Sequence, residues 1–167
     1  HGIYIEDARL TAYAENAARS VRVAGLISGK GTAKTVHEDL RRLRSAHSAL
    51  AQKARDNPVN QAQEWLLDNW YLAVREGQDA CDAFRHSKRL HTAGKDPRIF
   101  TLATTLLRAG VGEVTMERCE LFLDGFQQVS PLSREELGLF VPALIGAAVH
   151  ALAELYQDAA ADGEYAG

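Results

Sequence analysis

The chain has 167 residues, of which 46% are hydrophobic and 25% charged, and its formal net charge is −3. This length suits one domain with a buried core, and the composition excludes disordered and collagen-like classes. The negative charge disfavours nucleic acid as a partner, because nucleic-acid-binding domains usually carry a basic excess.

The cysteines and the apolar runs indicate the cellular setting of the protein. Cys81 and Cys119 fit neither a zinc-binding spacing nor a disulfide framework, so we expect a reduced, cytosolic setting. There is no signal peptide, and no apolar run reaches the roughly 18 residues that a membrane span needs. Since the chain begins with His1 rather than Met, we expect a fragment of a larger multidomain protein.

Two helices are predicted in the first third of the chain. The first runs from Glu6 to about Ala24 and has an apolar face of small residues. The loop of residues 28–32 contains a Gly-Lys-Gly-Thr segment, but it lacks the Walker spacing and a preceding strand, so it predicts a connection rather than a phosphate site. Thr35 and Glu38 form a capping box that opens a helix to about Asp56.

The second of these helices carries a run of basic residues. They are Arg41, Arg42, Arg44, Lys53 and Arg55. No aromatic residues interleave with them, so they indicate a solvated helix face rather than a nucleic-acid surface.

One long helix, or a kinked pair of helices, is predicted from the Asn57-Pro58 start signal to about Leu90. Glu64 and Asp68 share one face of it, among both tryptophans of the chain. Carboxylates four residues apart can act as acid and base or bind a metal ion, but no Asp-x-Asp or His-x-x-Glu motif accompanies them. We therefore predict no catalytic, cofactor-binding or metal-binding residue here, and a structural partner for the two acids on another helix.

Arg98 is the predicted partner. Asp96-Pro97 starts a helix that ends at Gly110, and Arg98 lies in its first turn, where the helix dipole disfavours a cation. A bidentate, partly buried ion pair with Glu64 or Asp68 would compensate. The predicted structural polar cluster consists of Glu64, Asp68, Asn69 and Arg98.

The last third of the chain predicts two more helices. Thr115 caps the first, which ends near Val129, and Ser133 and Glu136 form a capping box for the second. That helix should run from Arg134 to about Ala160 with a kink at Pro142. No strand is predicted. The expected fold is all-α: an irregular bundle of about six helices, arranged as antiparallel hairpins in a single domain over residues 1–167.

Three segments resemble one protein family. Residues 64–69, Glu-Trp-Leu-Leu-Asp-Asn followed by an aromatic, look like a stretch near the N-terminus of cyclic β-1,2-glucan synthases. Residues 97–103, Pro-Arg-Ile-Phe-Thr-Leu-Ala, are similar to a second segment of that family. Residues 130–142 look like a third, although Gly138 stands where the family has a tryptophan. The segments occur in the family's order, and the similar region covers roughly Pro58 to Leu155.

The resemblance implies a role within a larger enzyme. Such synthases are inner-membrane proteins that polymerise glucose from UDP-glucose with a family 84 glycosyltransferase domain, followed by a phosphorylase-like region. The chain would then be a non-catalytic N-terminal accessory domain on the cytoplasmic side of that membrane, and soluble as a fragment. Its partner would be the transferase domain of its own polypeptide, with no nucleic acid and no membrane span of its own. UDP-glucose would be used by the parent only, and no catalytic residue of the family has a counterpart in this chain.

Two alternatives remain open. A stand-alone helical ligand-binding or sensor domain would have a closed pocket lined by Trp65, Trp70, Tyr71 and Phe100. An enzyme that used Glu64 and Asp68 as acid and base would hold both carboxylates in an open cleft. An accessory domain would instead expose an apolar patch on one helix face.

Overall fold

The computed structural model describes the backbone of residues 3–164 and the side chains of residues 3–157, so the ends of the predicted single domain, at residues 1–2 and 165–167, lie outside it. The prediction of an all-α fold is confirmed, with seven helices and a small sheet in the described part. The helices are α1 (Asp7–Ser20), α2 (Lys30–Lys53), α3 (Gln61–Arg85), α4 (Arg98–Ala109), α5 (Met116–Val129), α6 (Arg134–Gly138) and α7 (Phe140–Glu164). The strands are β1 (Leu26–Ile27), β2 (Leu90–Ala93) and β3 (Asp96–Pro97).

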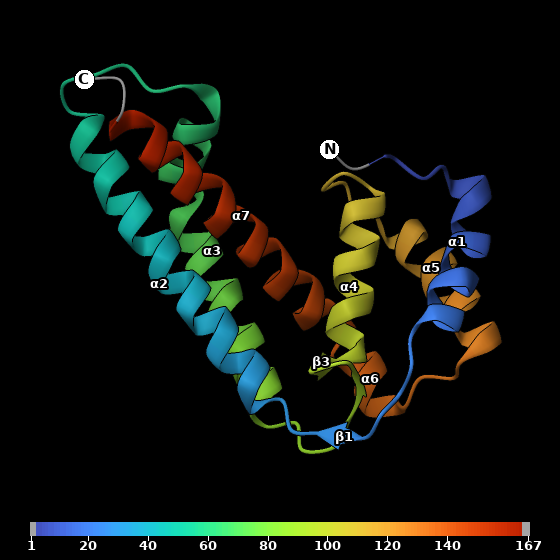
Figure 1. Ribbon diagram of the computed structural model, residues 1–167. Coiled ribbons are helices and arrows are strands. Elements are labelled where there is room, and N and C mark those ends of the chain that lie inside the picture. Colours follow the sequence, from blue (N-terminus) through green and yellow to red (C-terminus); the bar gives the residue numbers. More distant parts are fainter. Residues whose placement is uncertain (1–2, 165–167) are drawn as a thin grey trace.

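The helices form two groups (Figure 1). α2 and α3 make an antiparallel hairpin, as predicted, and α7 packs along both to give a long three-helix arm. α4 crosses the first half of α7 and leads into a second group, in which α1 packs against α5. The pairing of α1 with α5 joins helices that are distant in the sequence, so only part of the bundle is built from hairpins.

Each group has its own apolar core. The larger core lies among α1, α4, α5 and the start of α7, and its fully buried side chains include Leu10, Phe122 and Phe126. In the three-helix arm, Leu43 and Leu66 pack with Tyr156. α7 contributes to both cores, and so do α2, through Ala33, and α3, through Phe84, so these three helices connect the two groups.

The prediction that the chain contains no strand is wrong. β1 pairs with β2, and β2 pairs with β3, both antiparallel, in a sheet at one end of the molecule (Figure 1). Strands of two to four residues are too short to produce a visible alternation of polar and apolar residues. Gly94 has φ +66° in the turn between β2 and β3, a conformation that favours glycine.

The start of α2 also differs from the prediction. The helix begins at Lys30, so the predicted loop of residues 28–32 is largely its first turn, and Thr35 lies inside it. Gly29 is the N-cap of α2, and its backbone contacts the residues at the end of α3. The Gly29 N–H donates to the Ser87 carbonyl at 2.8 Å. A Cβ at Gly29 would lie 2.1 Å from the Phe84 carbonyl oxygen, so only glycine fits.

Three other helix starts are displaced. Asn60, not Asn57, caps α3 and forms a capping box with Gln63. Asp96 belongs to β3, so α4 begins without a side-chain cap. The predicted kinked helix after Ser133 is two helices, α6 and α7, and Pro142 sits in the first turn of α7, where no backbone bond is lost. The caps Thr115 and Ser133 and the end at Gly110 are confirmed.

Candidate functional site

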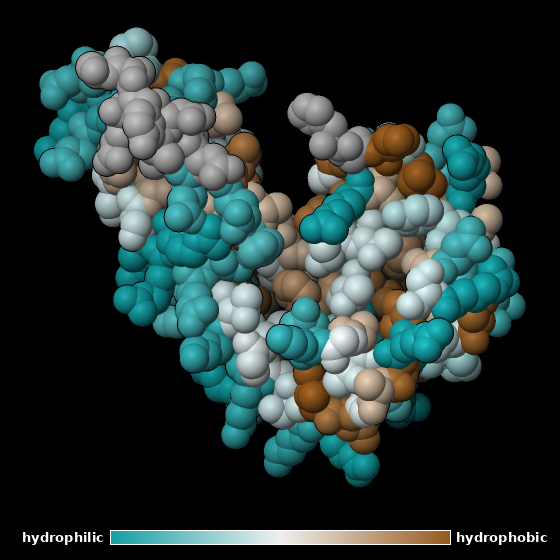
Figure 2. Space-filling model, in the orientation of Figure 1, coloured by the Kyte–Doolittle hydropathy of each residue, from teal (hydrophilic) through white to brown (hydrophobic). Residues whose placement is uncertain are grey.

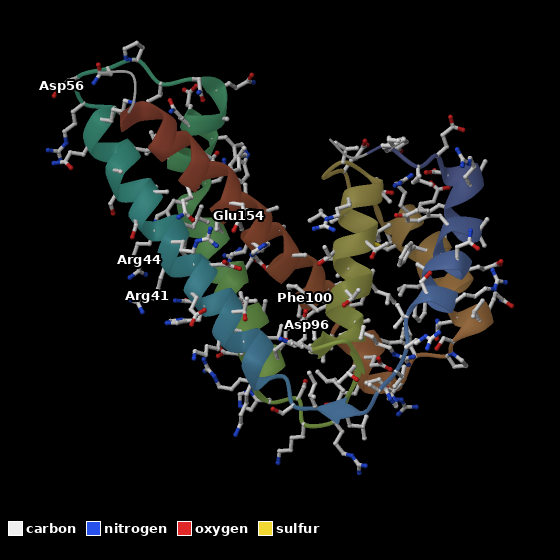
Figure 3. The ribbon with its side chains drawn as sticks, viewed as in Figure 1. Arg41, Arg44, Asp56, Asp96, Phe100 and Glu154 are labelled. Carbon is white, nitrogen blue, oxygen red and sulfur yellow. The ribbon has the colours of Figure 1, made fainter. Side chains whose placement is uncertain are left out.

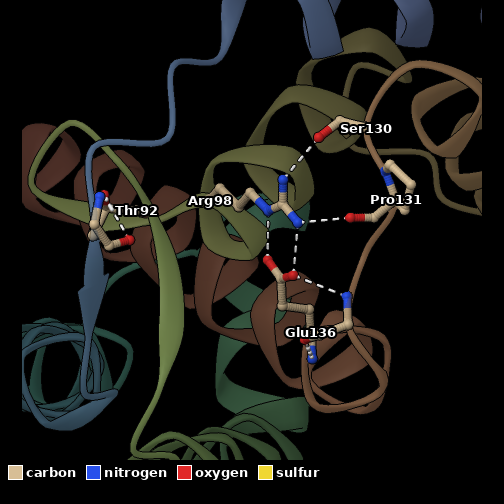
Figure 4. A network of polar contacts seen from close by, with 7 residues as sticks. Thr92, Arg98, Ser130, Pro131 and Glu136 are labelled. Carbon is tan, nitrogen blue, oxygen red and sulfur yellow. Dashed lines mark hydrogen bonds and ion pairs between the residues drawn. The ribbon is translucent and has the colours of Figure 1, made fainter.

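Arg98 forms a buried bidentate ion pair, as predicted, but its partner is Glu136 (Figure 4). Its Nε donates to one carboxylate oxygen at 2.6 Å and its Nη2 to the other at 2.8 Å. The remaining donors reach the Ser130 hydroxyl and the Pro131 carbonyl, both at 2.9 Å. The guanidinium therefore joins the start of α4 to the turn between α5 and α6.

Glu136 is fully buried, and its carboxylate serves both the ion pair with Arg98 and the cap of α6. One of its oxygens also accepts the Ser133 backbone N–H at 3.0 Å, which completes the capping box of α6. Burial raises the pKa of this carboxyl, but the hydrogen bonds from Arg98 and Ser133 outweigh it and leave the pKa below its usual value. This satisfied ion pair holds two segments together and presents no free acid or base to a substrate.

The predicted cluster of Glu64, Asp68, Asn69 and Arg98 does not assemble. Glu64 and Asp68 are exposed on α3, and Arg98 is buried in the other helix group. The Asn69 amide donates to the Trp65 carbonyl within α3. The prediction of Glu64 or Asp68 as the partner of Arg98 was wrong because a shared helix face does not reveal which side of the helix meets the protein.

The four aromatic residues proposed for a ligand pocket lie apart. The side chain of Trp65 is 46% exposed and that of Tyr71 is 80% exposed. Trp70 stacks on His47 with ring centroids 4.7 Å apart, and Phe100 packs edge-on against Phe84. They line no common pocket, so the structure gives the sensor alternative no specific support.

A second polar network, which the sequence did not reveal, links α2 to α7. The buried Asp39 accepts from Arg42 at 3.0 Å and contacts Nδ1 of His150 at 2.9 Å. Arg42 also donates to Glu154 at 2.8 Å and to Gln157, and lowers the pKa of the Glu154 carboxyl. The groups face one another across two helices, so the network fixes how α7 lies on α2.

The structure also bears on metal and thiol chemistry. No group of three or more His, Cys, Asp or Glu side chains is placed to hold a metal ion within the part of the chain that the structure describes. Cys81 and Cys119 are both free. Burial raises the pKa of each thiol, which opposes the thiolate form that nucleophilic cysteines need.

The surface feature of most interest is an apolar face on α7. Its residues recur every three or four positions: Val141, Leu144, Ala148, Ala151 and Leu155. Val141 is 62% exposed and Leu155 is 58% exposed, and no charged residue interrupts the face. Hydrophobic and small residues border the hollow between the two helix groups in Figure 2, along the course of α7. We call these five residues the α7 face.

By length and hydropathy, α7 also resembles a membrane-spanning helix. Phe140–Gln157 is long and apolar enough to cross a bilayer, with 39% of its residues buried in the protein. The core helix of a globular protein can have the same length and hydropathy, and α7 packs against α2, α3 and α4. The apolar character of α7 is therefore explained in part by the core.

Comparison of the chain with protein-family models, curated proteins and solved structures found no match.

Proposed function

We propose that the chain is a non-catalytic N-terminal accessory domain of a membrane-bound glycosyltransferase similar to cyclic β-1,2-glucan synthases. The three sequence segments of residues 64–69, 97–103 and 130–142 support this family. The parent enzyme would use UDP-glucose, and the domain would pack on, position or regulate the transferase on the cytoplasmic side of the inner membrane.

Two of these segments acquire a physical role in the fold. Arg98 lies in the second segment, and its partners Ser130, Pro131 and Glu136 all lie in the third. Their mutual hydrogen bonds give both segments a structural role in this fold. In the first segment only Leu66 is fully buried, in the core of the arm, whereas Glu64, Trp65 and Asp68 are exposed on α3. Exposed residues that are not needed for the fold are available to a partner.

The α7 face is the observation that carries the docking role. Val141 and Leu155 are exposed at its two ends, and Leu144 between them is partly buried against the larger core. Exposed aliphatic side chains are unfavourable in water, and covering them with a partner is favourable. α3, which packs beside α7, also exposes the apolar side chains of Trp65 and Leu72. We propose that the transferase domain covers this area.

The test is a charge placed on the α7 face of the full-length polypeptide. Val141→Glu and Leu155→Glu should each reduce glucan synthesis from UDP-glucose in membranes by about tenfold, because a buried unpaired carboxylate is costly at an interface. Met116→Glu is the matched control, since Met116 is 80% exposed on α5.

The thermal midpoint of the chain should change little in all three variants, since exposed substitutions rarely alter stability by more than about 0.5 kcal/mol. Normal synthesis by both α7 variants would refute docking through this face. Absence of any UDP-glucose-dependent synthesis by the unmodified parent would refute the proposed family role itself.

A further inference from the structure

The charge of this acidic chain is unevenly distributed. Two segments, residues 16–37 and 83–95, contain eight of the nineteen Lys and Arg residues and none of the twenty-two Asp and Glu residues. The rest of the chain is therefore strongly acidic. Such a separation produces a local positive potential on a protein of negative net charge.

The fold brings these two segments together at one end. β1 pairs with β2, with Leu26 opposite His91, and the Gly29 N–H donates to the Ser87 carbonyl. Lys30 and Lys88 directly follow Gly29 and Ser87, so the two ammonium groups extend from adjoining backbone. Lys30, Lys34 and Arg85 line one surface depression beside them. We call Lys30, Lys34, Arg85, Lys88 and Arg89 the basic end.

The cations of the basic end are free to bind an anion. All five residues are exposed, and only Arg85 forms an ion pair, with Asp82 at 3.1 Å. Lys30, Lys34, Lys88 and Arg89 have no carboxylate within ion-pair distance among the residues that the structure describes. Figure 3 shows nitrogen-tipped side chains that project from this lower end of the molecule into solvent.

Exposed aliphatic residues lie next to the cations. Val23 is 46% exposed and Leu26 is 45% exposed, on the segment that leads into β1 and on β1 itself. The sole Phe, Tyr or Trp of the two acid-free segments, Phe84, is fully buried. Bases of single-stranded nucleic acid stack on exposed Phe, Tyr or Trp rings, and these two segments have none. Aliphatic side chains among cations suit instead the boundary between lipid headgroups and acyl chains.

We propose that the basic end binds the surface of an anionic lipid bilayer. The four unpaired cations contact acidic headgroups, while Val23 and Leu26 enter the interface at shallow depth. The α7 face is a different surface, so this inference does not rest on the proposed docking to a transferase. It assigns a membrane contact to the domain itself.

The test is sedimentation of the whole chain with vesicles. Vesicles of phosphatidylcholine with 30% phosphatidylserine should bind the chain, and vesicles of phosphatidylcholine alone should not. Binding should weaken as NaCl is raised from 50 to 300 mM, because salt screens headgroup charge. Lys88→Ala combined with Arg89→Ala should weaken binding about 30-fold, since each cation near such a surface contributes roughly fivefold.

Arg41→Ala combined with Arg44→Ala is the matched control. These residues point outward on α2 (Figure 3), but Arg41 lies seven residues, or about 10 Å, along the helix from Lys34, the cation of the basic end nearest to it in α2. That distance exceeds the Debye length of about 8 Å at physiological salt, so binding should be almost unchanged. Leu26→Ser should weaken binding by a similar factor at 50 and 300 mM NaCl, because salt does not screen the apolar contribution.

Three results would overturn the proposal. They are equal binding of the Lys88/Arg89 variant and the unmodified chain, equal loss in the Arg41/Arg44 control, and retention of the unmodified chain by oligo(dT) but not by the anionic vesicles. The last result would assign the basic end to nucleic acid. Circular dichroism of each variant should match that of the unmodified chain, because every substituted side chain is exposed.

Discussion

Glu136 shows how one buried side chain can satisfy two local requirements. An α-helix needs acceptors for its first N–H groups, and an arginine in a first helical turn needs a counter-charge. Glu136 supplies the first need for α6 and the second for Arg98 at the start of α4. Both helix starts therefore depend on one carboxylate.

Loss of this carboxylate should be costly. Glu136→Ala leaves the buried Arg98 guanidinium without a counter-charge, so the free energy of unfolding should fall by about 3–5 kcal/mol. Urea denaturation followed by circular dichroism measures the change. Glu135→Ala is the control, because Glu135 is exposed on the same short helix and should change stability by no more than about 0.5 kcal/mol. Similar losses in both variants would contradict the role of the ion pair.

The same residue predicts acid sensitivity. The pKa of Glu136 is lower in the folded protein than in the unfolded chain, so its stabilising contribution is complete above the unfolded pKa of about 4.3. The contribution should decline as the pH falls through the folded pKa. Stability measured by urea denaturation between pH 6 and pH 3 should therefore drop less steeply in Glu136→Gln, which is less stable at pH 6 but does not titrate. Parallel pH profiles would refute this.

At the scale of helices, local sequence patterns predicted that a helix exists better than they predicted where it starts. The amphipathic periods of the long helices and the caps Thr115 and Ser133 were visible because they depend on residues three or four apart. The start of α2 was not visible, because Gly29 is placed by the Ser87 and Phe84 carbonyls more than fifty residues away. The Arg98 partner was not visible for the same reason: Glu136 lies 38 residues away, and its spacing from Ser133 indicates only a local cap.

The contact between α1 and α5 predicts a sharp response at one glycine. A Cβ on Gly125 would lie 2.5 Å from the Thr11 carbonyl oxygen and 3.0 Å from the Ala14 Cβ. Gly125→Ala should therefore separate the helices and lower the free energy of unfolding by about 1–3 kcal/mol.

Gly31→Ala is the opposite case within a helix. No atom lies within 4 Å of a Cβ at this exposed position in the first turn of α2. The variant should be more stable by up to about 1 kcal/mol, because alanine favours the helix. Thermal unfolding of the two variants side by side distinguishes them, and equal stability would show that the helices can adjust without cost.

Over the whole molecule, three groups of surface residues differ in their chemistry. The α7 face is apolar, the basic end is cationic, and the exposed edge of α3 carries Glu64 and Asp68. The sequence displayed each set of residues but not its location, since the relative orientation of α3, α4 and α7 follows from packing between distant segments. The charge asymmetry was concealed for a similar reason: the two acid-free segments become one surface only when β1 pairs with β2.

The pairing of α1 with α5 has a consequence for synthesis on the ribosome. α2 and α3 are neighbours in the chain and can form their hairpin as soon as both have emerged. α1 is made well before α5, yet its buried residues Leu10, Ala14 and Ala18 are covered mainly by Phe122 and Phe126. For more than one hundred residues of elongation this N-terminal helix remains uncovered, so the nascent chain is a natural client for chaperones that bind short apolar segments.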